Sequence, residues 1–360
     1  PIGLPVLKVL VGAGYVPELV VCNPDRAAGR GQISTEPPWK QSSVEQSIAV
    51  WQPESLKDRT SVEAKLNQYD LFIVVAYNRI FPEWLISLPK HKTINVHPSL
   101  LPKLRGPSPI RSAILEDTPE VIGVSIMQMD AEMDHGPIIG QTPLFLQTHE
   151  WPVNGVELDS RLALLGAEIL TEVLEPWLSG AISPQPQNHT EATYTKKLTK
   201  DMGELQIDPF KLPTGKTARE TYLKIQGLAG WPGTYFFHND VRIKITKAEL
   251  VNDQLRLVEI IPAGKSSTDF SMWLERQRKW VFELSLFTQL IIHYTGTATN
   301  SAPNGFSRLG ERFSDMSLSG DWDVGVGWRG YFYWHMIHVT AKSRADPTHY
   351  DINLDIAFMD

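Results

Sequence analysis

The stretch Thr93–Pro102 constrains the fold most, because an apolar strand there ends at two polar side chains. Residues two apart in a strand share a face, so Asn95 and His97 should point the same way. Pro98 cannot donate to a central ladder, and the strand should therefore end near His97. Open α/β sheets bind ligands at the carboxyl ends of their parallel strands. The stretch therefore predicts either a ligand site or a buried polar pair, and these residues alone leave both open.

A second stretch, residues 123–139, carries the next polar groups. Residues 124–129 alternate as a strand does, which places Asp130 at the strand end and Asp134 in the loop beyond. We expect Gly136 to leave room for a flat ligand ring. Together the two stretches resemble the formyltransferases that use 10-formyltetrahydrofolate. The resemblance covers most of residues 1–275, and it implies that Asn95, His97 and Asp134 form the catalytic set.

Formyl transfer lets an amine attack a formyl carbon, which leaves negative charge on the formyl oxygen. We expect the Asn95 amide and a protonated His97 to donate hydrogen bonds to that oxygen. A pairing with Asp134 should raise the pKa of His97, favour its cation and, with a water, relay the proton of the amine. No metal is predicted, because His97 and His135 lack the spacing and thiolate company of a zinc site.

The resemblance further implies that the loop after the apolar run 71–76, itself expected as the central core strand, contacts the pterin through its backbone. Asn78 stands where the family usually has Gly, and Asn tolerates left-handed backbone angles. Asp130 and His135 also have simpler interpretations, as a loop cap and an exposed neighbour. The residues expected to bind the formyl donor are Ala76, Tyr77, Asn78, Ile80, His97, Pro98, Ser99, Leu100, Leu101, Pro102, Asp130 and Asp134.

Within this family the sequence is most similar to the branch that formylates methionyl-tRNA, on residues 23–31, 192–198 and 231–233. Glycines flank Arg30, and guanidinium groups suit phosphates and stacked bases. The resemblance implies that this basic loop enters the acceptor stem with Arg30 in the key position. Without the resemblance, these basic residues would be interpreted as part of a solvated loop or strand edge. The expected tRNA contacts are Arg26, Arg30, Lys40, Lys196, Lys197, Arg242 and Lys244.

The fold class predicted is α/β: a Rossmann-like catalytic domain with a mostly parallel sheet, then a small OB-like β-barrel domain and a β-rich tail. The expected domains are residues 1–180, a linker over 181–200, the tRNA-binding domain over 201–275 and an unassigned extension over 276–360. Periodicity predicts helices over 5–13, 158–178 and 218–226 and strands over 19–21, 233–237, 241–248 and 254–261. The family places one more strand ahead of the first helix, and we expect the catalytic domain here to lack it.

Composition narrows the remaining choices. The chain has 360 residues, 42% of them hydrophobic, and one cysteine, so it can build real cores and has no internal disulfide framework. No apolar run reaches the roughly 18 residues of a membrane span, and we expect a cytoplasmic monomer. A net charge of −7 argues against indiscriminate nucleic-acid binding, although a local basic face can still hold RNA. The predicted function is formylation of methionyl-initiator tRNA for translation initiation. A formyltransferase for a sugar or another small amine, and a non-catalytic RNA-binding remnant, remain alternatives.

Overall fold

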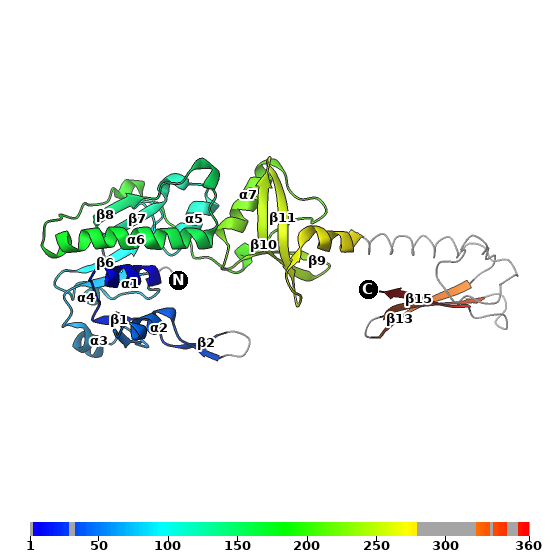
Figure 1. Cartoon of the computed structure of the whole chain (residues 1–360), viewed down its shortest axis with the longest axis horizontal. Helices are drawn as coiled ribbons and strands as arrows, with labels where there is room; N and C mark the ends of the chain where they lie inside the picture. Colours follow the sequence, from blue (N-terminus) through cyan, green and yellow to red (C-terminus); the bar gives the residue numbers. More distant parts are fainter. Residues whose placement is uncertain (1–2, 29–32, 279–321, 332–333, 344–351, 360) are drawn as a thin grey trace. The chain divides into compact units, whose positions relative to one another are not determined.

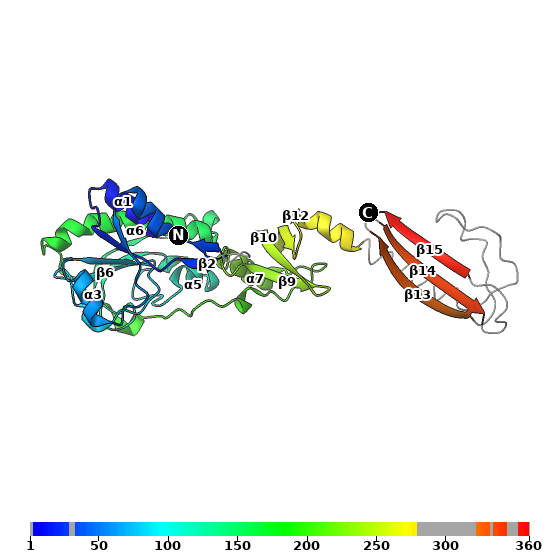
Figure 2. The same cartoon turned by 90° about the horizontal axis from the view of Figure 1, so that it is seen from below.

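The computed structural model describes residues 3–28, 33–278, 322–331, 334–343 and 352–359. It divides into two units, Pro1–Phe270 and Ser271–Asp360, which are described separately below. The first unit holds an α/β part and an antiparallel β part (Figures 1 and 2). Arg30, one of the expected RNA contacts, lies outside the described residues.

The α/β part is built from short strands that alternate with helices. Its order is α1 (Gly3–Gly12), β1 (Leu19–Val21), β2 (Arg26–Ala28), β3 (Ile33–Thr35), α2 (Pro38–Glu45), β4 (Ala49–Trp51), α3 (Arg59–Leu66), β5 (Phe72–Val75), α4 (Glu83–Ile86), β6 (Thr93–His97), α5 (Pro109–Leu115), β7 (Gly123–Gln128), β8 (Ile138–Pro143) and α6 (Gly155–Leu178). β1 pairs with β4, and a second sheet has the order β5-β6-β7-β8. The β1–β4 and β5–β6 pairs are parallel, whereas β6–β7 and β7–β8 are antiparallel. The predicted α/β class is confirmed.

Helix α6 covers the sheet because its apolar residues recur at helical spacing. Leu158, Leu162 and Leu170 are almost fully buried, and α6 packs on β7 and β8. Burying one such leucine contributes about 1.5–3 kcal/mol. The helix starts where the Asn154 side chain accepts a hydrogen bond from the Val156 N–H at 3.0 Å. This helix fixes the sheet whose strand ends carry the polar residues.

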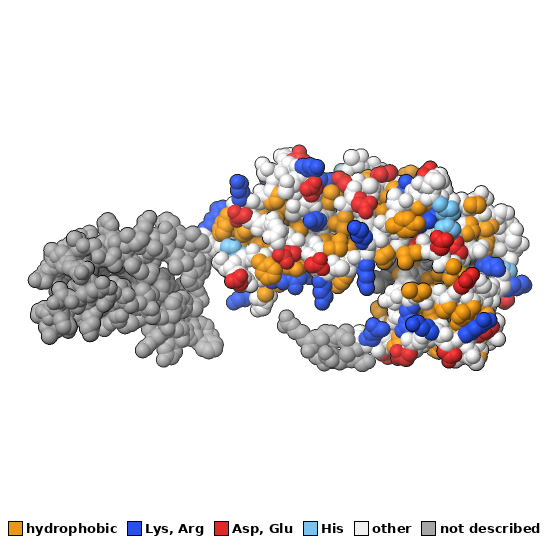
Figure 3. Space-filling view, turned by 180° about the vertical axis from the view of Figure 1, so that it is seen from behind, with side chains coloured by type: hydrophobic (Ala, Val, Ile, Leu, Met, Phe, Trp, Pro, Cys, Tyr) orange, Lys and Arg blue, Asp and Glu red, His pale blue; other side chains and the backbone are white. Residues whose placement is uncertain are grey.

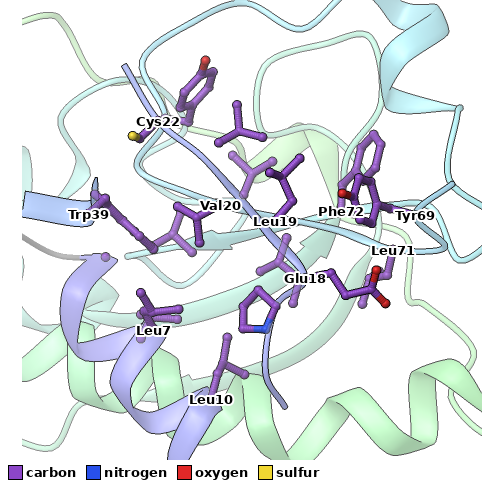
Figure 4. A pocket seen from close by; sticks show the side chains of 18 of the residues that line it. Leu7, Leu10, Glu18, Leu19, Val20, Cys22, Trp39, Tyr69, Leu71 and Phe72 are labelled. Atoms are coloured by element: carbon purple, nitrogen blue, oxygen red, sulfur yellow. The ribbon is translucent and has the colours of Figure 1, made fainter. Parts of the chain in front are cut away.

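Strand β5 lies at an edge of its sheet rather than at the centre that we expected for residues 71–76. Among the described strands it pairs with β6 alone, and β1 pairs with β4 alone. Between β1 and β5 lies a cavity of about 570 Å³, whose lining is largely apolar (Figure 4). Helix α1 supplies Leu7 and Leu10 to its wall, and Cys22 lines it as well. Burial raises the pKa of the Cys22 thiol.

The antiparallel part follows α6 and a segment with little regular structure. It contains α7 (Gly215–Gly227), β9 (Thr234–His238), β10 (Val241–Val251), β11 (Gln254–Pro262) and β12 (Thr268–Asp269), with the sheet order β12-β11-β10-β9. The predicted small OB-like domain is present as an antiparallel sheet, and its three predicted strands agree with β9, β10 and β11 within three residues at each end. Arg219 of α7 binds Asp117 of the α/β part at 2.8 Å, which ties the two parts together.

The second unit contains β13 (Trp322–Tyr331), β14 (Trp334–Ser343) and β15 (Ile352–Met359). They form one antiparallel sheet in this order, in agreement with the β-rich tail that the sequence predicted. Among the described residues, no helix combines the length and apolarity that crossing a bilayer requires.

Candidate active site

The structure brings Asn95, His97 and Asp134 together, as the sequence predicted. Asn95 Nδ2 donates to Asp134 Oδ1 at 3.5 Å, and His97 Nδ1 lies 3.5 Å from the same oxygen. The His97 side chain is 4% exposed and the Asp134 side chain 15%. Both distances are at the long limit of a hydrogen bond. The three polar groups therefore converge at the carboxyl end of β6.

Backbone contacts hold Asp134 in place. The Gly106 N–H donates to Asp134 Oδ2 at 2.7 Å, and Asp134 itself takes a left-handed φ of 51°. A Cβ built on Gly136 would lie 1.9 Å from the Gln128 carbonyl oxygen. Our expectation that Gly136 makes room for a ligand ring is therefore wrong, because the carbonyl of β7 fills that space.

The expectation of a protonated His97 is wrong as well. Burial lowers the pKa of His97, and although Asp134 and the Leu104 carbonyl raise it, they do not reverse this effect. His97 Nε2 lies 3.1 Å from the Leu104 carbonyl oxygen, which can only accept, so the ring proton is assigned to Nε2. In the neutral ring Nδ1 then turns its lone pair toward Asp134. This arrangement suits a general base rather than a resting cation.

The turn after β6 sends alternate residues into the fold. Ser99 Oγ donates to the Lys103 carbonyl at 2.6 Å, and the Leu101 N–H donates to Ser125 Oγ at 3.1 Å. The side chains of Ser99 and Leu101 are buried, at 0% and 3% exposure. These two residues shape the turn from inside. The other residues of this turn that we expected to bind the formyl donor are half-buried: Pro98, Leu100 and Pro102.

The loop after β5 differs in detail from its prediction. The residue with a left-handed φ is Ala76, at 49°, and not Asn78, which accepts instead from Asn23 Nδ2 at 3.1 Å. Ala76 and Tyr77 line the cavity between β1 and β5. Ile80 is 94% exposed.

Asp130 serves its own loop. Its Oδ1 accepts from the Glu132 N–H at 3.0 Å, and its Oδ2 lies 2.6 Å from His135 Nδ1. His135 stacks on His189 with ring centroids 4.0 Å apart, so it has a partner that the sequence did not suggest. These contacts agree with the loop-capping interpretation of Asp130.

Sequence reasoning missed Arg105 and Gln187. Arg105 is 1% exposed, and its Nη2 donates to Gln187 Oε1 at 2.6 Å. The Gln187 Nε2 group donates to the carbonyls of Asp134 and Gly136 at 2.9 and 2.7 Å. The segment expected to be a linker thus contacts the loop that carries Asp134. An arginine in the leucine-rich turn 100–105 was the available signal.

The expected RNA contacts are divided. Lys40 binds both Asp25 and Glu36 at 2.7 Å, so its ammonium is already paired with two carboxylates. The other described members are exposed: Arg26, Lys196, Lys197, Arg242 and Lys244. Arg242 and Lys244 alternate with buried residues along β10 and therefore share the outer face. Lys and Arg side chains also gather along one edge of the face in Figure 3.

Among the described residues, no cluster of His, Cys, Asp or Glu has the arrangement of a metal site.

Residues 15–174 match the family described as formyl transferase, and residues 215–277 match the formyl transferase C-terminal domain. A methionyl-tRNA formyltransferase of Chloroflexus aurantiacus is 34% identical over 294 residues, covering 74% of this chain and 91% of the relative. One of a Sulfurihydrogenibium species is 36% identical over 264 residues, covering 72% and 81%. The chain belongs to the methionyl-tRNA formyltransferase family. It is an enzyme of formyl transfer.

A solved sugar N-formyltransferase from a Shewanella species is also similar, with a TM-score of 0.52 and 20% identity. The match covers 69% of this chain and 95% of that structure. At this identity the likeness shows that the two share a fold.

Proposed function

We propose that this formyltransferase moves a formyl group from 10-formyltetrahydrofolate to the amino group of methionyl-initiator tRNA, in support of translation initiation. The observation that carries the proposal is the match to methionyl-tRNA formyltransferases over more than 70% of the chain. The convergence of Asn95, His97 and Asp134 supports the chemistry.

In this mechanism the amine nitrogen attacks the formyl carbon, and the C–N bond forms as negative charge moves to the oxygen. Asn95 Nδ2 is the donor aimed at that charge. His97 Nδ1 accepts the proton that the amine loses, and the Asp134 carboxylate stabilises the resulting imidazolium. The bond from the formyl carbon to the donor nitrogen then breaks, and that nitrogen takes the proton from His97.

The acceptor is argued from the exposed basic residues. Arg242 and Lys244 form a short cationic row on β10, and the Arg242 guanidinium lies 3.7 Å from the centroid of the Tyr235 ring. A guanidinium stacked on an aromatic ring is a surface that can receive phosphates and bases. Lys196 and Lys197 add two exposed cations on the segment that returns to the catalytic loop. These groups favour a polyanionic acceptor over a small sugar amine.

The direct test is formyl transfer by the purified chain from 10-formyltetrahydrofolate to methionyl-tRNA, with an amino-sugar nucleotide in parallel. Transfer to the tRNA alone is expected. Transfer to the sugar alone would overturn the acceptor assignment, and no transfer to either would overturn the function.

The RNA face is tested by removing its charges. Arg30→Ala and the double change Arg242→Ala with Lys244→Ala should raise KM for methionyl-tRNA and leave folate affinity, measured by calorimetry, unchanged. Arg256→Ala, an exposed arginine toward the other end of the β10–β11 hairpin, is the matched control. Equal losses in the control would show a general effect of charge, and lost folate affinity in Arg30→Ala would assign that loop to the donor site.

A further inference from the structure

Arg105 is a buried cation without a carboxylate partner. It is 1% exposed and forms no ion pair with any described carboxylate. Its guanidinium instead reaches three uncharged groups: Gln187 Oε1, Tyr194 Oη at 3.3 Å and His189 Nδ1 at 2.9 Å. An unpaired buried charge is costly, so stability is a poor explanation for its presence.

Arg105 dictates how Gln187 is turned. Arginine can only donate hydrogen bonds, and both Nη2 and Nε point at Gln187 Oε1, at 2.6 and 3.2 Å. The amide must therefore present its oxygen to Arg105 and its Nε2 group to the opposite side. There Nε2 meets two carbonyl oxygens, those of Asp134 and Gly136. Each group in this chain of contacts has one orientation that satisfies it.

The same segment also holds the Asp134 carboxylate. The Gly106 N–H donates to Asp134 Oδ2 at 2.7 Å, directly after Arg105 in the chain. The Arg105 backbone is itself fixed, because its N–H donates to the Thr193 carbonyl at 2.8 Å and its carbonyl accepts from the Thr195 N–H at 2.7 Å. Asp134 is thus gripped at its carboxylate by Gly106 and at its backbone by Gln187.

The charges around His97 oppose one another. The groups that act on its ring are the Asp134 carboxylate, the Arg105 guanidinium and the Leu104 carbonyl. Arg105 lowers the pKa of His97, whereas Asp134 raises it. The guanidinium therefore helps to keep the imidazole neutral before the amine arrives, which is the form that a general base needs.

We propose that Arg105 and Gln187 form a clamp that positions Asp134 opposite His97 Nδ1. The inference rests on the proposed role of His97 as the base. Neither clamp residue is assigned a contact with substrate, so both are positioning residues. Their effect should fall on kcat rather than on KM.

Three variants separate the two parts of the clamp. Arg105→Met removes the positive charge and the N–H donors that orient Gln187. Arg105→Lys keeps the charge but loses the planar guanidinium with its two donors to Gln187 Oε1. Gln187→Met keeps Arg105 and removes the hydrogen bonds to the Asp134 and Gly136 carbonyls. Arg111→Met is the matched control, because Arg111 is also largely buried but binds Asp159 of α6. A change in the thermal stability of any of these four variants decides nothing by itself.

We expect kcat to fall by about 10²-fold in Arg105→Met and Gln187→Met, the loss typical of a displacement of about 1 Å, with KM nearly constant. The acid limb of kcat/KM should move to higher pH in Arg105→Met and stay near its original pH in Arg105→Lys and Gln187→Met. Arg111→Met should keep both kcat and the limb. Unchanged kcat and acid limb in Arg105→Met, or equal kinetic losses in Arg111→Met, would overturn the clamp.

A second readout does not depend on the acceptor. The imidazole of His97, followed by NMR in the enzyme without substrate, should titrate at higher pH in Arg105→Met than in the unchanged protein. If the unchanged chain fails to formylate methionyl-tRNA, the proposed function fails, while this titration still reports whether the Arg105 charge acts on His97. If the chain is active and neither this titration nor kcat changes in Arg105→Met, the clamp is refuted and the function stands.

Discussion

Replacing Asp134 with Asn removes one charge and keeps the shape of the side chain. The Asn oxygen can still accept from the Gly106 N–H, the contact that Asp134 makes at 2.7 Å. The amide group then faces His97 Nδ1, 3.5 Å from the present carboxylate oxygen, and donates to the lone pair that should take the proton of the amine. We therefore expect Asp134→Asn to fold normally and to lose most of its turnover.

The size of the loss follows from the geometry. Two unit charges about 4 Å apart attract by about 4 kcal/mol at an effective dielectric constant of about 20. His97 and Asp134 are 4% and 15% exposed, so solvent screens little of this attraction. The imidazolium forms only as the reaction proceeds, and about 1.4 kcal/mol corresponds to a factor of ten in rate. A loss of about 10²–10³ in kcat is expected.

The assay is single-turnover formyl transfer to methionyl-tRNA over a range of pH, with thermal melts alongside. Because Asp134 raises the pKa of His97, its loss lowers that pKa, and the acid limb of activity should move to lower pH. A kcat within a factor of a few of the unchanged enzyme, or an acid limb at higher pH, would refute the assigned role of Asp134.

One further prediction concerns packing. Gly136→Ala should lower the free energy of unfolding by about 1–3 kcal/mol and also lower turnover, because its Cβ would lie 1.9 Å from the Gln128 carbonyl oxygen. Gly12→Ala is the control and should not destabilise the protein, because nothing lies within 4 Å of its Cβ. Equal melting temperatures for the two variants would contradict this prediction.

Local patterns predicted the elements whose periodicity is strong. Helix α6 was expected over 158–178 and spans Gly155–Leu178, and the polar pair of β6 lies where Pro98 ends the strand. The charge state of His97 was missed, because burial of an imidazole depends on elements that the sequence does not place in space. We expected Gly136 to leave space for a ligand, but the Gln128 carbonyl of the neighbouring strand β7 occupies that space.

Contacts between distant residues were beyond sequence reasoning. Arg105 and Gln187 are 82 residues apart, and Gln187 lies between prolines and polar residues that are typical of a linker. The sequence around Arg105 does not indicate a contact with Gln187, and the sequence around Gln187 does not indicate one with Arg105. A charged residue in a buried turn does indicate that some partner must exist, since an unsatisfied guanidinium would be too costly.

The charges of Asp134 and Arg105 should shift the pKa of His97 in opposite directions, and this distinguishes their electrostatic effect from a general loosening of the packing around His97. Burial is the largest cause of the low pKa of His97, so any variant that lets water in should raise that pKa. Loosening therefore predicts shifts to higher pH in both Asp134→Asn and Arg105→Met. The electrostatic account predicts shifts in opposite directions, lower in the first and higher in the second. Since Arg105→Lys loosens the fork without removing the charge, a limb that stays in place in that variant would assign the Arg105→Met shift to the guanidinium.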